Sequence, residues 1–488
     1  MLRKWTVKIL AIAIYGSLGA FLAFLIVFVL YLNGRPDLSA WHKADLDKEF
    51  TRRSGVTSFI EYLQLEERLF RQLDEEVYEQ IEPHERSRLN RYNHGSMADP
   101  TGRDPDWNRS FEWMPGQPRA AVLLLHGMSD SPYSLRAVGQ QLNRSGAYVL
   151  GLRIPGHGTA PAGLVRVTWK DMAAAVQLAV QHIAEEAPGL PIHVVGYSNG
   201  AALAVNYVLS SVENSDWPRI ESVVLLSPEI GVTGAAAYAV WQARIGVLLG
   251  LDKLAWNSIN PEYDPYKYGS VAVNAGDVAY RLTEQIQVQL TELGEAGKLD
   301  QVPPILAFTS LVDATVNAPA LVENLSARLP EGGHDLVLFD INAMEGMESI
   351  LRWSPDAWYA ALAGNKNRPF LLELVTNENA GSRRVKLVSL DAGEDDQQVR
   401  ALGLAWPRDV FSLSHVALPF PPDDPLYGNW ERGSDTGMRL GSLALRGERG
   451  VLHVSGDDML RMRWNPFYAF MEERILSFLQ LEPDHNKR

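Results

Sequence analysis

The sequence contains no cysteine. Thiol catalysis, disulfide bridges and cysteine-ligated metal sites are therefore excluded. Positive charge is also scarce, because 45 lysines and arginines stand against 59 aspartates and glutamates, for a formal net charge of -14. This balance argues against nucleic acid and against an anionic membrane surface as partners. The chain has no His-Glu-x-x-His pattern, P-loop or dinucleotide-binding glycine motif, so we expect no metal, nucleotide or other cofactor.

A long hydrophobic run is present at the N-terminus. Arg3, Lys4 and Lys8 precede an uncharged stretch over residues 9–32. About 24 residues span ~36 Å as a helix, which is enough to cross a bilayer with some tilt. The run continues beyond the usual length of a cleaved signal peptide, which remains the alternative. We therefore predict a single-pass signal anchor over residues 1–33, with a cytoplasmic N-terminus and the rest of the chain on the exported side.

The remaining chain has the composition of a globular protein, with 46% hydrophobic and 21% charged residues. Residues 34–112 predict a helical preamble, since "SFIEYLQLEERLFRQLDEEVYEQI" has apolar residues at helical spacing. Residues 113–488 alternate short apolar strands with helices, which predicts an α/β fold with a doubly wound, mostly parallel sheet. The expected strands cover residues 121–125, 147–152, 191–195, 222–227 and 304–310.

Two stretches interrupt this alternation. Residues 229–300 predict a helical cap inserted between two core strands, and its start, "AAAYAVWQARIGVLLGL", is strongly apolar. Trp241 in that start is a candidate for contact with an acyl chain, with packing in the core as the alternative. Residues 342–406 predict an extra strand insertion, because "FLLELVTN" and "RRVKLVSL" are typical of paired strands.

The stretch "VVGYSNGAAL" places Ser198 between two glycines. An apolar strand ends just before it and a helix without bulky side chains in its first turn follows. Strand, sharp turn and helix are the context that a nucleophile elbow requires. An ordinary turn between a strand and a helix is the alternative. We interpret Ser198 as a nucleophile.

A nucleophilic serine needs a histidine to accept its proton and a carboxylate to orient that histidine. With an elbow of this kind the order along the chain is serine, acid, histidine. The histidines that come late enough are His334, His415, His453 and His485. His334 precedes its strand, His453 lies inside a predicted strand and His485 lies in a polar tail. His415 follows "VFSLS", which we read as the end of an apolar strand, and is the expected base.

The expected acid is Asp313, which follows the strand "PILAFTS". Asp340 and Asp391 also end apolar runs and remain alternatives. The oxyanion requires two preorganised backbone amides, for which Asn199 and Met128 are the candidates. His126 and His157 precede the nucleophile, so we assign them to loop architecture.

Five motifs together resemble the α/β-hydrolase superfamily, in its serine aminopeptidase-like and monoacylglycerol-lipase-like branch. They are "LLLHGMSDSPYSL", "LRIPGHGTAP", "VVGYSNGAALA", "TSLVDATV" and "LSHVALPF". The resemblance covers roughly residues 120–474. It implies a catalytic triad of Ser198, Asp313 and His415, with the amides of Met128 and Asn199 as the oxyanion hole. The interval between acid and histidine is longer than is usual in the superfamily, which keeps Asp340 and Asp391 open. Asn199 also replaces the more common small or acidic neighbour of the nucleophile.

The main hypothesis is a membrane-anchored serine hydrolase that cleaves acyl or lipid-like carboxylic esters through an acyl-enzyme. Its partners are then a small-molecule ester or lipid substrate and, through the N-terminal helix, the membrane. An alternative is a serine aminopeptidase or amidase, for which Glu262 or Asp264 in the cap supplies a carboxylate for a free amine. A non-catalytic binding protein with the same fold is the third hypothesis. The sequence does not give the substrate, because specificity in such folds lies in the cap.

Overall fold

The computed structural model describes residues 2–231, 251–343, 351, 354–429, 439–441 and 456–482. Several predictions concern residues outside these ranges. They are the apolar start of the cap with Trp241, and the strand and tail assignments of His453 and His485.

A ten-stranded sheet forms the centre of the molecule, in the order β1-β3-β2-β4-β5-β8-β9-β10-β11-β12. Its strands are β1 (Phe111–Trp113), β2 (Ala120–Leu125), β3 (Ala147–Leu152), β4 (Ile192–Tyr197), β5 (Ser222–Leu226), β8 (Ile305–Ser310), β9 (Asp335–Phe339), β10 (Leu371–Asn377), β11 (Arg384–Leu390) and β12 (Gln398–Ala405). The strands from β3 to β10 are parallel to one another, whereas β1, β11 and β12 pair antiparallel. The predicted mostly parallel sheet is confirmed.

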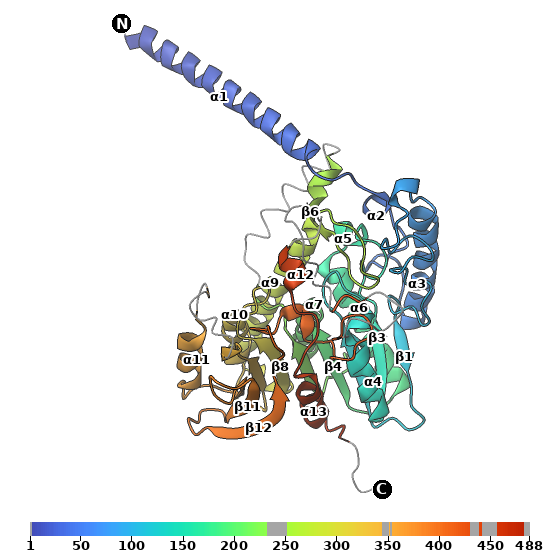
Figure 1. Ribbon diagram of the computed structural model, residues 1–488, viewed down its shortest axis with the longest axis vertical. Coiled ribbons are helices and arrows are strands. Elements are labelled where there is room, and N and C mark those ends of the chain that lie inside the picture. Colours follow the sequence, from blue (N-terminus) through green and yellow to red (C-terminus); the bar gives the residue numbers. More distant parts are fainter. Residues whose placement is uncertain are drawn as a thin grey trace.

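Helices cover both faces of this sheet (Figure 1). One face packs against α3 (Phe59–Leu73), α6 (Trp169–Glu186), α7 (Asn199–Glu213), α9 (Val273–Glu295), α10 (Ala318–Asn324) and α11 (Asp356–Ala363). The other face packs against α4 (Arg136–Arg144) and α13 (Tyr468–Phe478). Every residue of β2, β3 and β4 is buried, because the sheet is covered on both sides. This burial explains why the strands are continuous apolar runs in the sequence.

The helical preamble packs on this core. Helix α3 continues into a π-helical turn, Asp74–Tyr78, and its apolar face is buried. The hydroxyl of Tyr62 donates to the carbonyl oxygen of Arg153. The buried guanidinium of Arg153 in turn donates to the carboxylates of Glu66 and Glu49, at 2.9 and 3.0 Å. The preamble therefore fixes the loop that follows β3, and α2 (Ala40–Lys43) and α5 (Gly163–Arg166) lie nearby.

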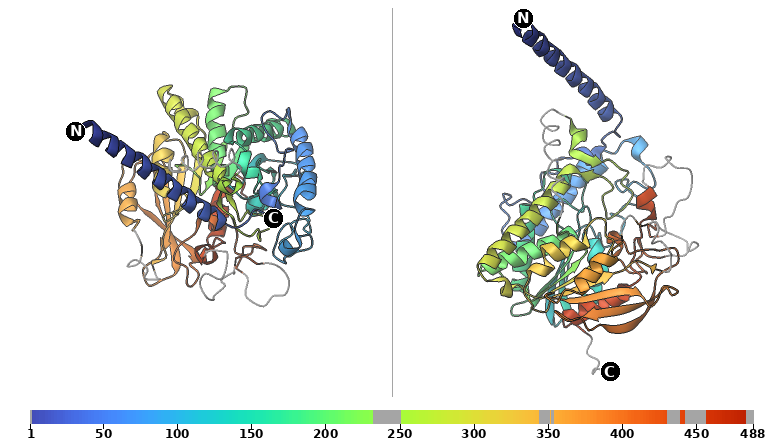
Figure 2. Two further views of the ribbon diagram at one scale, coloured as in Figure 1. Left: turned by 90° about the horizontal axis from the view of Figure 1, so that it is seen from above. Right: turned by 90° about the vertical axis from the view of Figure 1, so that its left-hand side faces the viewer.

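The N-terminal helix α1 (Leu2–Asn33) extends away from the body in all three views (Figures 1 and 2). Residues 12–33 are long and apolar enough to cross a membrane, with a mean hydropathy of 2.5 and none of that window buried. A signal sequence near the N-terminus can meet the same criteria of length and composition. Just beyond α1, the guanidinium of Arg35 donates to the carbonyl oxygens of Lys253 and Trp256. The end of α1 is thereby connected to the segment that leads into the site described below.

The structure describes part of each stretch that interrupts the alternation of strands and helices, residues 229–231 and 251–300 of the first and residues 342, 343, 351 and 354–406 of the second. Between β5 and β8, a small antiparallel pair, β6 (Trp256–Ser258) and β7 (Val271–Ala272), precedes α9. Helix α9 packs on α7 and belongs to the core of the sheet domain. In the second stretch, the predicted pairing of "FLLELVTN" with "RRVKLVSL" is confirmed as β10 and β11. The expectation of a strand before His415 is wrong, because residues 410–414 are not in a strand and His415 opens a short 3₁₀ turn, His415–Ala417.

Candidate active site

Ser198 lies at the sharp turn between β4 and α7. Its backbone has φ 55° and ψ -117°, a conformation that a non-glycine residue adopts only when its surroundings enforce it. The two flanking glycines allow this turn because a Cβ on Gly196 would lie 2.5 Å from the Cα of Ala201, and a Cβ on Gly200 would meet the carbonyl oxygens of Leu125 and His126. Strand and helix can therefore approach closely, and the serine projects at the carboxyl edge of the sheet.

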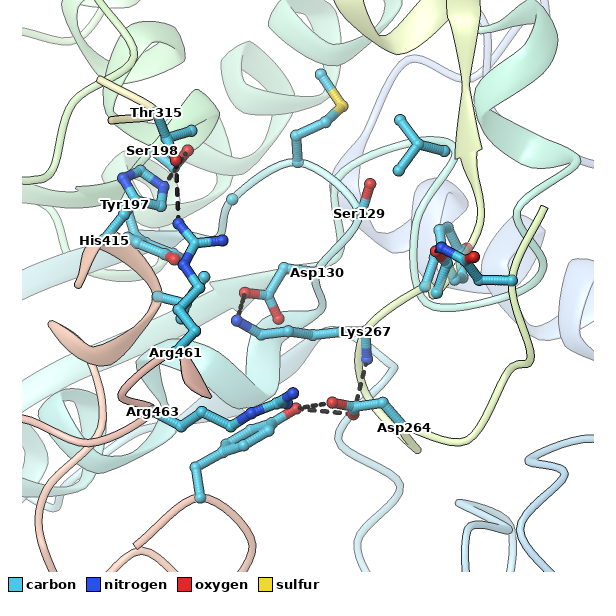
Figure 3. Close-up of a pocket in the computed structure, with 18 of the residues that line it drawn as sticks. Ser129, Asp130, Tyr197, Ser198, Asp264, Lys267, Thr315, His415, Arg461 and Arg463 are labelled. Atoms are coloured by element: carbon cyan, nitrogen blue, oxygen red, sulfur yellow. Dashed lines mark hydrogen bonds and ion pairs between the residues drawn. The ribbon is translucent and has the colours of Figure 1, made fainter. Parts of the chain in front are cut away.

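Ser198, His415 and Asp313 are brought into contact from three distant parts of the chain, and Figure 3 shows Ser198 and His415 side by side. The Nε2 atom of His415 lies 3.2 Å from the Oγ atom of Ser198. The Nδ1 atom of the same ring lies 3.0 Å from the Oδ2 atom of Asp313. All three residues are buried, with 6 to 8% of their surface exposed. A serine hydroxyl, an imidazole and a carboxylate in this order can pass a proton from the serine to the ring.

The environment of Asp313 keeps it ionised. Burial alone would raise its pKa, but the hydrogen bond and charge of His415 and the amides of Val316 and Thr315 lower the pKa below its usual value. These two amides donate to Oδ1 at 2.9 and 2.8 Å, which leaves Oδ2 for the imidazole. The carboxylate is thus oriented as well as charged.

The two alternative acids lie elsewhere. Asp340 accepts hydrogen bonds from the amide of Ile341 and the hydroxyl of Thr376. Asp391 is exposed, and its carbonyl oxygen accepts a hydrogen bond from Arg368. Neither carboxylate is bonded to a histidine among the described residues.

Three other histidines near the sheet, His126, His157 and His334, bind backbone groups. Nε2 of His126 accepts a hydrogen bond from the amide of Ile154, which ties the loop after β2 to the loop after β3. His157 is buried beside His126, with ring centroids 5.0 Å apart, and burial lowers its pKa to about 4. His334 lies before β9, and its Nδ1 atom accepts a hydrogen bond from the amide of Ile305.

The two residues expected to form an oxyanion hole are near Ser198. Asn199 is the first residue of α7, so its amide is one of those that have no acceptor within the helix. Its side chain is buried and its Nδ2 atom points to the sulfur of Met172, away from the pocket. Met128 lies in the loop after β2 and lines the same pocket as Ser198.

This pocket has a volume of about 450 Å³ and two walls. Loops at the carboxyl edge of the sheet form the first wall, with Gly127–Asp130, Tyr197, Ser198 and His415. The second wall consists of residues 258–271, between β6 and β7, and of the segment after α12 (Gly456–Leu460), which carries Arg461 and Arg463. Sequence reasoning missed Lys267, Arg461 and Glu229 in this pocket. Arg461 lies in a segment with no sequence motif, so no pattern in the sequence could have predicted its place in the pocket.

The carboxylates of the second wall already have partners. Both oxygens of Glu262 accept backbone amides, from Gly269 and Ser270, at 2.8 Å. Asp264 accepts the hydroxyl of Tyr427 at 2.7 and 2.8 Å and also two backbone amides. These bonds hold the loop between β6 and β7 in shape.

Comparison with known proteins gives a family match over part of the chain. Residues 116–294 match the family described as "Serine aminopeptidase, S33". The match includes Ser198 and ends before Asp313 and His415. A search of curated proteins found no match. The resemblance expected from the motifs is confirmed, and the chain has an α/β-hydrolase fold.

Solved structures of lipolytic enzymes are among those that are similar. The monoacylglycerol lipase of Paleococcus ferrophilus is 20% identical, over 48% of this chain and 89% of that chain, with a TM-score of 0.35. A soluble variant of the monoglyceride lipase of Saccharomyces cerevisiae is 17% identical, over 47% and 82%, with a TM-score of 0.36. A structure from the work on the metagenome-derived lipolytic enzymes LipS and LipT is 19% identical, over 48% and 87%, with a TM-score of 0.36.

Proposed function

We propose that this α/β-hydrolase is a serine hydrolase that cleaves carboxylic esters, with Ser198 as nucleophile, His415 as general base and Asp313 as the acid that orients it. The observation that carries this proposal is the chain of contacts from Ser198 Oγ through His415 to Asp313, at 3.2 and 3.0 Å. The pocket that Ser198 and His415 line has a volume typical of a small-molecule site.

The geometry supports an acyl-enzyme mechanism. His415 takes the proton of Ser198 as Oγ attacks the ester carbonyl carbon. The oxyanion that forms accepts hydrogen bonds from the amides of Met128 and Asn199. His415 then gives its proton to the departing alkoxide, which leaves as the alcohol. A water molecule, activated by the same ring, hydrolyses the acyl-Ser198 bond and releases the carboxylic acid. Asp313 remains ionised throughout and stabilises the imidazolium.

An aminopeptidase activity is less well supported. It requires a carboxylate that is free to bind the amine of the substrate. Glu262 and Asp264, the two candidates from the sequence, are each bonded to groups of their own loop. Ester hydrolysis needs no such group, and the site supports it best.

Labelling with a fluorophosphonate tests the nucleophile. We expect the full-length protein to be labelled and Ser198→Ala to lose both labelling and the hydrolysis of 4-nitrophenyl esters, roughly a 10⁶-fold loss of turnover. Ser129→Ala is the matched control, because Ser129 is a second serine in the same pocket. Labelling that persists in Ser198→Ala and disappears in Ser129→Ala would reject the assignment.

A panel of substrates tests the reaction class. Acyl esters of increasing chain length are compared with amino-acid amides that have a free amine and with the same amides after acetylation. We expect ester hydrolysis to dominate. Faster cleavage of the free-amine amides would favour the aminopeptidase alternative.

We further propose that residues 1–33 anchor the protein in a membrane, with the catalytic domain on the exported side. Because the chain lacks cysteine, Asn379→Cys introduces a single thiol at an exposed position of the sheet domain. We expect the protein to stay with membranes after alkaline carbonate extraction and to react with a membrane-impermeant maleimide in intact cells. A soluble protein beginning near Gly34 would indicate a cleaved signal, and labelling only after lysis would place the domain in the cytoplasm.

A further inference from the structure

The pocket that holds Ser198 is also lined by three cationic side chains, Lys267, Arg461 and Arg463. All three come from the second wall of the pocket, and Figure 3 shows Arg461 beside His415 and Lys267 between Asp130 and Asp264. A neutral ester needs no cation near the scissile bond. The presence of these groups therefore raises the question of which of them are balanced by acids of the protein.

Two of the three cations are balanced. The Nζ atom of Lys267 lies 3.2 Å from the Oδ2 atom of Asp130, which is buried. Burial alone would lower the pKa of Arg463, yet the neighbouring side chains of Tyr263 and Asp264 raise it. Arg463 therefore lies within the field of a carboxylate. The charges of Lys267 and Arg463 are therefore each accounted for by a neighbouring carboxylate of the protein.

Arg461 has a neutral partner instead. Its guanidinium donates one hydrogen bond, at 3.0 Å, to the hydroxyl of Thr315. Among the residues that the structure describes, Arg461 forms no ion pair with an aspartate or glutamate. A guanidinium has five N–H donors in a planar fork, so the described part of the chain leaves most of its donors and its whole charge available to a ligand.

Arg461 lies close to the proposed catalytic residues. Thr315, its partner, donates its backbone amide to Asp313 at 2.8 Å. Burial raises the pKa of Tyr197, the residue before Ser198, and the charge of Arg461 acts to lower it. Figure 3 shows the guanidinium directed toward Ser198, Thr315 and His415. A substrate bound to Ser198 is therefore within the field of Arg461.

The acidic groups of the pocket do not cancel this charge. Asp130 is paired with Lys267, and Asp264 accepts hydrogen bonds from Tyr427 and from its own loop. Glu229 also lines the pocket, but burial raises its pKa to about 7, so it is only partly ionised at neutral pH. Among the described residues that line the pocket, Lys267 and Arg463 therefore have an acid beside them, whereas Arg461 forms no ion pair with one.

We propose that Arg461 binds an anionic group, a carboxylate or a phosphate, carried by the ester that Ser198 attacks. This inference rests on the proposed function and narrows its substrate class to negatively charged esters. The planar fork of an arginine matches both kinds of anion with two parallel hydrogen bonds. The anion can belong to the acyl part or to the alcohol part of the ester, and the two arms of the experiment separate these cases.

The test compares pairs of esters that differ in charge, using the full-length protein in detergent. For the acyl side, 4-nitrophenyl hydrogen succinate is compared with 4-nitrophenyl butyrate. For the alcohol side, 1-butyrylglycerol 3-phosphate is compared with 1-butyrylglycerol. The measured quantity in each pair is the ratio of kcat/KM for the anionic ester to that for the neutral one. A variant that damages the catalytic groups lowers kcat/KM for both esters alike, so this ratio does not change.

We expect Arg461→Gln to lower this ratio about 10- to 100-fold in one of the two pairs, as is typical when a hydrogen-bonded charge is lost. Arg461→Lys should retain part of the ratio, because it keeps the charge and loses the fork. Arg408→Gln, at an exposed arginine outside the pocket, should leave the ratio unchanged. Melting temperatures of the variants establish that each is folded.

The inference is overturned if Arg461→Gln changes both members of each pair in the same proportion, or if the wild type cleaves neutral esters and rejects both anionic ones. Either result leaves the proposed function standing, since neutral esters are still cleaved through Ser198. If Ser198→Ala keeps the labelling and the ester hydrolysis of the wild type, the proposed function itself is rejected.

Discussion

The two walls of the pocket are built on different principles. The first wall belongs to the sheet, whose parallel strands end at one edge and carry Ser198 and Asp313 there on rigid turns. The second wall, residues 258–271 and the segment after α12, is made of irregular backbone. It is held by side chains such as Asp264 and Tyr427, which bond across 163 residues of sequence. We infer that the first wall performs the chemistry and that the second selects the substrate.

This difference leads to a clear expectation for mutations. Changes of the proposed catalytic residues in the first wall should lower turnover of every substrate, because these groups act on the ester itself. Changes in the second wall should alter stability or the choice of substrate. The predictions below test this division, beginning with the largest expected effect.

Asp313→Asn should lower kcat about 10²- to 10⁴-fold for all esters. The amide no longer stabilises the imidazolium of His415, and its NH₂ group can face Nδ1 and hold the ring in the wrong tautomer. Fluorophosphonate labelling should slow in parallel, whereas the melting temperature should change little. Kinetics with a neutral 4-nitrophenyl ester check this prediction.

Asp340→Asn is the matched control for Asp313→Asn. Its carboxylate follows the neighbouring strand β9 and is bonded to Thr376 instead of a histidine. We expect nearly normal turnover. A crippled Asp340→Asn beside an active Asp313→Asn would assign the acid to Asp340.

Much of the first wall could be predicted from the sequence. Buried parallel strands are apolar runs, and their carboxyl ends meet at one edge, so the positions of Ser198 and Asp313 followed from local patterns. His415 was found by its order along the chain, although the strand expected before it is absent. Residues 410–414 resemble a strand in composition, but they form an irregular segment that packs beside β9 through Asn342.

The second wall could not be predicted in the same way. Arg461 and Lys267 lie in irregular segments, where no periodicity fixes the direction of a side chain. Their positions depend on contacts between distant segments, such as the one between Arg461 and Thr315, which are 146 residues apart. Glu262 and Asp264 were considered as ligands for an amine from their charge alone. Their hydrogen bonds to the loop become visible only in the structure.

Asp264→Asn should act on the stability of the second wall. The carboxylate accepts the hydroxyl of Tyr427 and two backbone amides, and an amide can replace only part of this set. We expect a loss of about 1–3 kcal/mol in the free energy of unfolding. The values of kcat/KM for esters and for free-amine amides should fall in equal proportion.

Asp252→Asn, at an exposed aspartate near the start of the same segment, is the control and should have no effect. A selective loss of activity on free-amine amides in Asp264→Asn would contradict the structural role. It would identify Asp264 as an amine ligand and favour the aminopeptidase alternative.

The smallest expected effect concerns Glu229, which follows β5 and lines the pocket. Its amide donates to the carbonyl oxygen of Ser198, and burial raises the pKa of its carboxyl group from 4.5 to about 7. The folded protein therefore binds this proton more tightly than the unfolded chain, and stability falls as the pH rises from about 4.5 to 7. Glu229→Gln has the same shape and does not titrate. We expect the variant to melt at the same temperature as the wild type near pH 4.5 and at most a few degrees higher at pH 8.

Glu292→Gln, at an exposed position of α9, should show no such trend. A difference that is constant with pH, or that grows toward acid, would mean that Glu229 is ionised in the folded pocket. Glu229 would then count among the charges that the substrate meets there, in opposition to Arg461.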